Sequence, residues 1–241
     1  MFDIVIPVGP SDISVITQQI EYTKNNIVGR RNIYIVTPNT DLVLDGCTII
    51  NDNTFPFTMK DLIAIKGESP RHGWYLQQLI KLYAGFVIPD ILDAYLVIDA
   101  DTFFIRPTKF YTDDGIPLYN VGTEYHMPYF NHMKELHNSL HRVHSSISGI
   151  CHHMIFEKKY ITELFSLIET THGLPFWKVF LNMVKYNYNG SGASEYEIYF
   201  NYMLINFPKN IRLRRLKWTN TNTLDKLKED YDYISYHWYM R

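Results

Sequence analysis

Two aspartates one residue apart, Asp99 and Asp101, are the side chains of this sequence best suited to metal chemistry. They directly follow the run Tyr95–Ile98, which predicts a buried strand because it is short, apolar and rich in β-forming residues. Side chains alternate along a strand, so we expect both carboxylates to point the same way. A cation such as Mg²⁺ or Mn²⁺ would relieve their repulsion and their lost hydration. The alternative is a solvated strand end, since aspartate is common in turns.

A second group of polar side chains lies in residues 71–83, shortly before this strand. Apolar residues recur there at spacings of three and four, which predicts an amphipathic helix. Gln78 and Lys81 are three residues apart and are therefore neighbours on its surface. From spacing alone, a solvated helix face is the simpler interpretation of the glutamine.

The elements needed to position these residues are those of an α/β protein. Strands are predicted at 2–8, 32–37, 47–50, 95–98, 118–121, 146–156, 211–218 and 231–236, and helices at 11–27, 58–65, 71–83, 157–170, 176–186 and from 194 onward. The early strand–helix–strand order and the near-continuous apolar strands predict one domain, with a mainly parallel central sheet flanked by helices. An open sheet of this kind binds ligands at the carboxyl ends of its strands.

Composition narrows the possible partners of the chain. It has 241 residues, 46% of them hydrophobic, and a net charge of -2, which does not favour nucleic acid as a partner. Cys47 and Cys151 lack metal-type spacing, and Gly9 stands without a glycine-rich phosphate loop. With no apolar run of spanning length and no signal-peptide pattern, we expect a cytoplasmic protein without a membrane span.

Five stretches in order resemble a known family. They are Gly73-Trp-Tyr-Leu-Gln-Gln-Leu-Ile-Lys81, Val97-Ile-Asp-Ala-Asp-Thr102, Ser148-Gly-Ile-Cys-His-His-Met-Ile155, Ser194-Glu-Tyr-Glu-Ile198 and Tyr236-His237. With them the chain resembles GT-A-fold glycosyltransferases. It is more closely similar to the small DUF6492 group, in which a Gly-Trp-x-x-Gln-Gln helix precedes the Asp-x-Asp strand. The composition also resembles giant-virus proteins, where related enzymes are associated with glycosylating collagen-like hydroxylysine.

The resemblance implies a role for each matching residue. A Mn²⁺ or Mg²⁺ ion facing the diphosphate of a nucleotide sugar would be held by Asp99, Asp101 and His237. The donor nucleotide sugar would be contacted by Pro7, Val8, Gly9, Arg71, Gln78, Lys81, Asp99 and Ala100. The acceptor would be bordered by His152, His153 and Glu195. The catalytic residues would be Asp101 and Glu195, the latter taking the hydroxyl proton if the enzyme inverts the sugar.

The implied reaction is transfer of a hexose, glucose or galactose, from a UDP-sugar to a hydroxyl of a glycan, peptide or protein. The most specific acceptor that the resemblance implies is galactosyl-hydroxylysine of a collagen-like protein. If the chain is viral, the expected location is the host cytoplasm or the virion. The resemblance favours a retaining enzyme, with donor binding in residues 1–121 and acceptor binding in 122–241. Two alternatives stay open: an inactive nucleotide-sugar or carbohydrate-binding module, and a nucleotidyltransferase.

Three histidines form a separate pattern. His137, His141 and His144 are spaced four and three apart, which predicts one face of a helix. A zinc site is one interpretation. No cysteine or His-Glu-x-x-His pattern accompanies them, so a polar helix flanking the acceptor groove is the preferred one.

Overall fold

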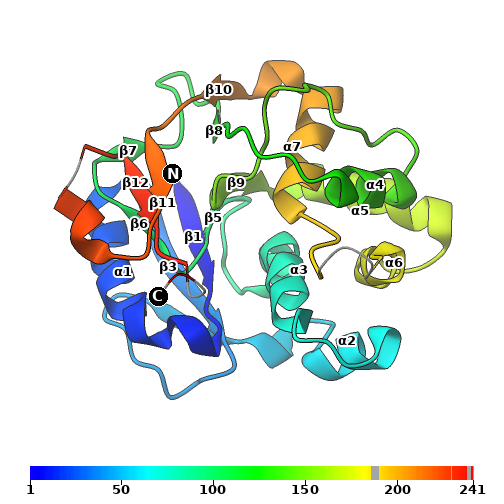
Figure 1. Cartoon of the computed structure of the whole chain (residues 1–241), viewed down its shortest axis with the longest axis horizontal. Coiled ribbons are helices and arrows are strands. Elements are labelled where there is room, and N and C mark those ends of the chain that lie inside the picture. Colours follow the sequence, from blue (N-terminus) through cyan, green and yellow to red (C-terminus); the bar gives the residue numbers. More distant parts are fainter. Residues whose placement is uncertain (186–189, 229, 238–239, 241) are drawn as a thin grey trace.

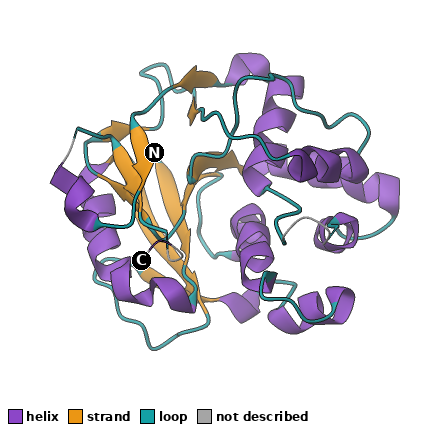
Figure 2. Cartoon of the chain, in the orientation of Figure 1, coloured by secondary structure: helices purple, strands orange, loops and turns teal. Residues whose placement is uncertain are grey.

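The fold is built around a five-stranded sheet (Figures 1 and 2). The computed structural model describes residues 1–185, 190–228, 230–237 and 240. From edge to edge the sheet contains β4 (Thr48–Asn51), β3 (Arg30–Thr37), β1 (Phe2–Pro7), β5 (Ala94–Ile98) and β9 (His153–Glu157). The first four strands are mutually parallel, and β9 runs antiparallel to β5. The predicted α/β fold with a mainly parallel central sheet is thus confirmed.

Helices flank this sheet, with α1 (Ile13–Asn26) on one side and α3 (His72–Val87) on the other, as Figure 1 shows. The further helices, gathered on the α3 side, are α2 (Met59–Lys66), α4 (Met127–Leu136), α5 (Lys158–His172), α6 (Phe176–Met183) and α7 (Glu195–Asn206). Short 3₁₀ turns are η1 (Pro10–Asp12), η2 (Asp52–Thr54), η3 (Pro208–Asn210) and η4 (Leu224–Lys228). All six residues of β1 are buried, as expected for a strand covered on both faces.

Three smaller sheets are found in the described part of the chain. A three-stranded sheet joins β11 (Trp218–Asn220), β12 (Tyr233–Ser235) and β6 (Thr102–Phe104). Two-stranded sheets pair β8 (Leu118–Asn120) with β10 (Arg212–Arg214), and β2 (Ile27–Val28) with β7 (Thr108–Lys109). The predicted strand 211–218 was wrong as one element, because its two halves pair with different strands. The main hydrophobic core draws on residues both before and after residue 121, and the functional division at that point stays a prediction.

The predicted strand 146–156 is also shorter than expected. Ser148 donates a hydrogen bond to the buried Glu197, and a Cβ on Gly149 would lie 2.6 Å from the Cβ of Phe200. These contacts draw residues 148 and 149 toward α7, so that the strand begins only at His153. The predicted helix 176–186 ends at Met183, and residue 186 lies outside the described residues.

The prediction that His137, His141 and His144 share one face of a helix was wrong. α4 ends at Leu136, and residues 137–147 form a loop. The Nδ1 atom of His137 contacts the Ser139 hydroxyl at 2.7 Å and accepts a hydrogen bond from the Ser139 N–H at 3.2 Å. Local side-chain bonds of this kind compete with helix continuation. His141 and His144 are therefore exposed loop residues, and no shared histidine face forms.

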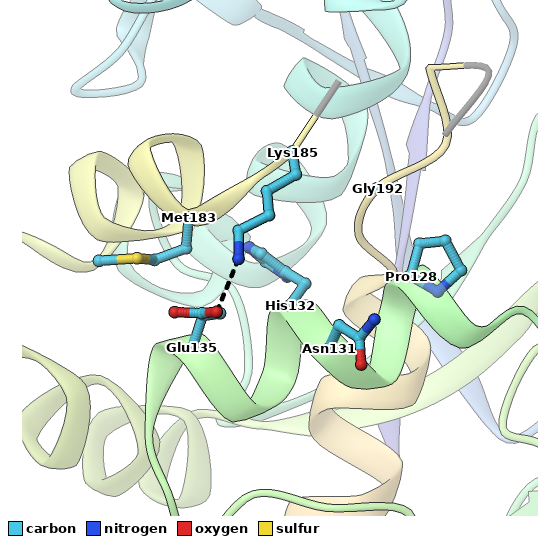
Figure 3. Close-up of a pocket in the computed structure, with 7 residues that line it drawn as sticks. All are labelled: Pro128, Asn131, His132, Glu135, Met183, Lys185 and Gly192. Carbon is cyan, nitrogen blue, oxygen red and sulfur yellow. Dashed lines mark hydrogen bonds and ion pairs between the residues drawn. The ribbon is translucent and has the colours of Figure 1, made fainter. Parts of the chain in front are cut away.

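His132 of α4 makes stability depend on pH. Its ring is buried, and Nε2 hydrogen-bonds the Phe180 carbonyl at 2.9 Å. Figure 3 shows it beside the ion pair of Glu135 with Lys185, which spans 2.7 Å. Burial lowers the pKa of His132 to about 4, although the Phe180 carbonyl opposes that shift.

We expect this histidine to cost stability as the pH falls. The unfolded chain takes up the proton near the ordinary pKa of about 6.5, whereas the folded chain resists it until about pH 4. Between pH 7 and 4.5 the wild type should lose about 2 kcal/mol of unfolding free energy through this group. Urea denaturation at stepped pH should show a correspondingly flatter profile for His132→Gln. Equal pH slopes in the two proteins would contradict the assignment.

Candidate active site

The two aspartates lie in the turn that joins β5 to β6. The turn is closed by a hydrogen bond from the Thr102 N–H to the Asp99 carbonyl, at 3.0 Å. The predicted position at a strand end is confirmed. We had expected the two carboxylates to point the same way because side chains alternate along a strand. That reason does not apply here, since both aspartates lie in a turn. Asp99 contacts Lys81, and Asp101 contacts His237.

Lys81 is the centre of a buried charge cluster. Its Nζ atom lies 2.5 Å from Oδ1 of Asp99 and 2.6 Å from Oε1 of Glu195, and the residue is 5% exposed. Tyr196 donates its hydroxyl to the same Asp99 oxygen at 3.0 Å, and its ring centroid lies 4.5 Å from Nζ. Three elements, α3, β5 and α7, thereby meet at one ammonium group.

The charges in this cluster stabilise one another. Burial lowers the pKa of Lys81, but the neighbouring carboxylates outweigh it and hold that pKa well above its usual range. Burial raises the pKa of Asp99, and the ammonium more than reverses this, so Asp99 stays ionised. The pKa of Glu195 is raised, mainly by burial and partly by Asp99, while Lys81 opposes the shift.

Gln78 positions the start of α7. Its Oε1 atom accepts the Glu195 N–H at 3.0 Å, while Ser194 caps the helix by accepting the Glu197 N–H at 3.3 Å. The Gln78 Nε2 atom is buried and has no hydrogen-bond partner within the described part of the chain. Glu195 is therefore fixed at both its backbone and its side chain.

His237 reaches Asp101 across 136 residues of sequence because β12 pairs antiparallel with β6, with Ser235 opposite Thr102. Its Nδ1 atom lies 2.9 Å from Oδ2 of Asp101, and Nε2 lies 3.0 Å from Oδ1 of Asn220. Burial lowers the pKa of His237, but the hydrogen bond with Asp101 outweighs it and raises the pKa. The Oδ1 atom of Asp101 is buried with no hydrogen-bond partner among residues 1–185, 190–228, 230–237 and 240.

His152 lies opposite Asp99 because β9 pairs with β5, and the Asp99 N–H donates to its carbonyl at 2.9 Å. Its φ is 62°, a left-handed conformation that costs energy for a residue with a side chain and often marks a functional site. Nδ1 lies 3.2 Å from Oδ2 of Asp99. Since the ionised carboxylate can only accept, Nδ1 is the protonated nitrogen in this contact, and in the neutral form of the ring Nε2 is an acceptor.

The structure does not bring every predicted residue to this cluster. His153 is 2% exposed, and its ring packs among those of Phe104, Phe110 and Tyr233. It therefore belongs to the core. Arg71 is the N-cap of α3, about 15 Å along the axis from Lys81. Ala100 is buried in the turn between the two aspartates.

Pro7, Val8 and Gly9 lie instead in an adjacent pocket of about 340 Å³ at the carboxyl ends of β1 and β3. The pocket is lined by Pro7, Val8, Gly9, Pro10, Val36, Pro38, Asp52, Asn53, Thr58, Met59, Gly73, Leu76, Gln77 and Ile80. A Cβ on Gly9 would lie 3.3 Å from Nε2 of Gln77, so the bare glycine lets that side chain approach the backbone.

Sequence reasoning missed Tyr196, Asn220 and Trp218. Tyr196 lies within the Ser194-Glu-Tyr-Glu stretch, but a chain with 19 tyrosines gives no signal for one of them. Trp218 lies with its ring 5.1 Å from that of His152 and stacks on Tyr233. Only the pairing of β11 with β12 brings Trp218 and Asn220 to the site.

Asp101 and His237 can serve as metal ligands. Within the described residues, no group of three or more His, Cys, Asp or Glu side chains is placed to hold a metal ion. The pair nevertheless offers a buried carboxylate oxygen, which has no hydrogen-bond partner among the residues that the structure describes, and an imidazole beside it. Divalent ions at phosphate sites are commonly held by one or two protein ligands, with substrate phosphates and water completing the shell.

Comparison with known proteins identifies the family. The family described as "Family of unknown function (DUF6492)" matches residues 20–239. The chain belongs to the DUF6492 family. Among solved structures, the DUF6492 chain is similar to the apo form of mouse xyloside xylosyltransferase 1, at 9% identity and a TM-score of 0.47, with 97% of each chain covered. No curated protein matches the sequence. Across the described residues, no helix has the length and apolar character needed to span a membrane.

We expect Lys81 to dominate the stability of the DUF6492 site. Lys81→Met would leave the buried Glu195 and the half-buried Asp99 without their cation, so it should cost about 3 kcal/mol or more of unfolding free energy. Lys134→Met, at an exposed position of α4, should change it by less than about 0.5 kcal/mol. Urea denaturation measures both. Equal small losses in the two variants would show that the ammonium group does not hold the cluster together.

Proposed function

We propose that this DUF6492 protein is a metal-dependent glycosyltransferase that moves a hexose from a UDP-sugar to a hydroxyl group. The observation that carries the proposal is the contact of Asp101 with His237 beside a pocket at the carboxyl edge of a parallel sheet. This edge is where open α/β sheets bind their ligands. A GT-A-like arrangement would put the nucleotide in the pocket near β1 and the diphosphate near the Asp-x-Asp turn.

The metal would be held by Asp101 and His237. A carboxylate with an imidazole suits Mn²⁺ better than Mg²⁺, because imidazole is the softer ligand. Asp99, the third expected ligand, already accepts hydrogen bonds from Lys81 and Tyr196 on one oxygen and faces His152 with the other. We therefore assign Asp99 to orienting Lys81 and His152. When bound, the ion would stabilise the negative charge that develops on the departing diphosphate.

The residues around the metal pair have distinct roles in this proposal. Lys81, held protonated by two carboxylates, fixes the Asp-x-Asp turn against α3 and α7. Lys81 thus serves as a positioning residue, although sequence reasoning assigned it to the donor. The acceptor-type Nε2 of His152 is suited to a hydrogen bond from the acceptor hydroxyl. Two observations support this role: Nε2 has no hydrogen-bond partner among the described residues, and the half-exposed ring of Trp218, which suits a sugar face, lies 5.1 Å from the His152 ring.

The stereochemical outcome we propose is retention. Glu195, the base that an inverting enzyme would need, is 3% exposed and bound to Lys81 at 2.6 Å. Burial and this contact with the ammonium group keep the carboxylate away from an acceptor hydroxyl. In a retaining enzyme the β-phosphate of the donor can take the hydroxyl proton instead. Glucose or galactose as the sugar, and galactosyl-hydroxylysine of a collagen-like protein as the acceptor, are proposed on family resemblance.

The test is an assay of nucleotide release. The protein is incubated with Mn²⁺ and each of several UDP-sugars, with and without hydroxyl acceptors, and free UDP is measured. We expect UDP release from one sugar donor, lost in Asp101→Asn and kept in Asp113→Asn, which alters an exposed surface carboxylate. UDP binding without release would favour the non-catalytic module. Release of pyrophosphate from a nucleoside triphosphate would favour the nucleotidyltransferase.

A second measurement tests the metal pair directly. His237→Ala should weaken Mn²⁺ binding to the UDP-loaded protein by about tenfold or more, because one of two protein ligands is lost. His144→Ala, which removes an exposed loop imidazole, should leave the affinity unchanged. Calorimetric titration of Mn²⁺ gives both values, with circular dichroism as the folding control. Equal Mn²⁺ affinities in wild type and His237→Ala would remove His237 from the metal site.

A further inference from the structure

The pocket beside β1 has one acidic side chain, Asp52. Its walls are mostly apolar, formed by Pro7, Val8, Pro10, Val36, Pro38, Met59, Leu76 and Ile80. Asp52 begins η2 directly after β4 and is half-buried. No ion pair found among the described residues includes it. A carboxylate that loses part of its hydration without gaining a cation is suited to face hydrogen-bond donors of a ligand.

The partial burial of Asp52 also changes the acidity of its carboxyl group. Burial raises the pKa of its carboxyl group, and the backbone N–H groups of Asn53 and Asp52 only partly oppose the shift. A hydrogen-bond donor on a ligand would replace the hydration that this carboxylate loses on burial. Asn53 and Thr58 also line the pocket, so a planar polar ligand could find further partners at its edge while its faces pack on the apolar walls.

The distance across the sheet fits a nucleoside diphosphate. In the order β4-β3-β1-β5, Asp52 follows the first strand and Asp99 follows the fourth. Three strand spacings of about 4.8 Å separate these strands by about 14 Å. An extended nucleoside diphosphate can cover that span, with its diphosphate beside the Asp-x-Asp turn. Its base would then reach the Asp52 end of the pocket.

We propose that Asp52 reads the nucleobase and selects uracil over cytosine. This inference rests on the proposed function, and it names the residue that makes the donor a uridine nucleotide. A carboxylate can only accept hydrogen bonds. Uracil presents an N–H at N3, in the middle of its pairing edge, whereas N3 of cytosine is itself an acceptor and would be repelled. The variant Asp52→Asn would lack this preference, since an amide both donates and accepts.

The experiment compares UDP with CDP by calorimetric titration in the presence of Mn²⁺. Wild-type protein should bind UDP about tenfold or more tightly than CDP, the range expected when one buried hydrogen bond is lost. In Asp52→Asn the ratio should fall toward one. Asp93→Asn should keep the wild-type ratio, because Asp93 is exposed and lies at the amino end of β5, away from the pocket.

Three results would overturn the inference. Wild-type protein that binds CDP as tightly as UDP has no such selection. A wild-type ratio retained in Asp52→Asn would remove Asp52 from the base. An equal loss of UDP and CDP affinity in that variant would put Asp52 on the ribose. In each of these cases the proposed glycosyltransferase still stands, whereas wild-type protein that binds neither nucleotide would contradict the proposed function itself.

Discussion

A single buried ammonium group, that of Lys81, is the interaction on which the site depends. It lies between two carboxylates that come from separate elements, Asp99 after β5 and Glu195 at the start of α7. Burial disfavours the charged form of all three groups, and the attraction between the ammonium group and the two carboxylates opposes that effect. The turn, α3 and α7 must therefore meet at one point. That requirement fixes the Asp-x-Asp turn before any ligand binds.

Two antiparallel strand pairs bring the remaining polar groups to this turn. β9 pairs with β5 and sets His152 beside Asp99, while β12 pairs with β6 and sets His237 beside Asp101. Both histidines thus come from late segments of the chain, but they reach the carboxyl end of an early strand. In the strand order, the pocket at the ends of β1 and β3 lies toward the β4 edge of the sheet, whereas His152 directly precedes β9, on the other side of β5.

The sequence predicted the parts of the site that depend on local pattern. A short apolar run followed by two aspartates located the turn, and helical spacing located the apolar part of the buried face of α3. The interpretation of Gln78 as a solvated side chain was wrong, because Gln78 is 1% exposed. The sequence could not predict which side chains those residues contact. Asp101 contacts His237, which follows β12, and Asp99 contacts Tyr196 of α7 as well as Lys81, so two of these partners lie more than 90 residues away in the sequence. His153 was expected at the acceptor, but strand alternation from His152 turns it into an aromatic core.

The most direct test of the central claim is X-ray diffraction at the manganese absorption edge from crystals grown with UDP and Mn²⁺. We predict one anomalous peak bonded to both Asp101 and His237 and to the diphosphate, with the uracil in the pocket beside Asp52 and Lys81 still between Asp99 and Glu195. UDP bound elsewhere, or an anomalous peak with neither Asp101 nor His237 in contact, would contradict the account.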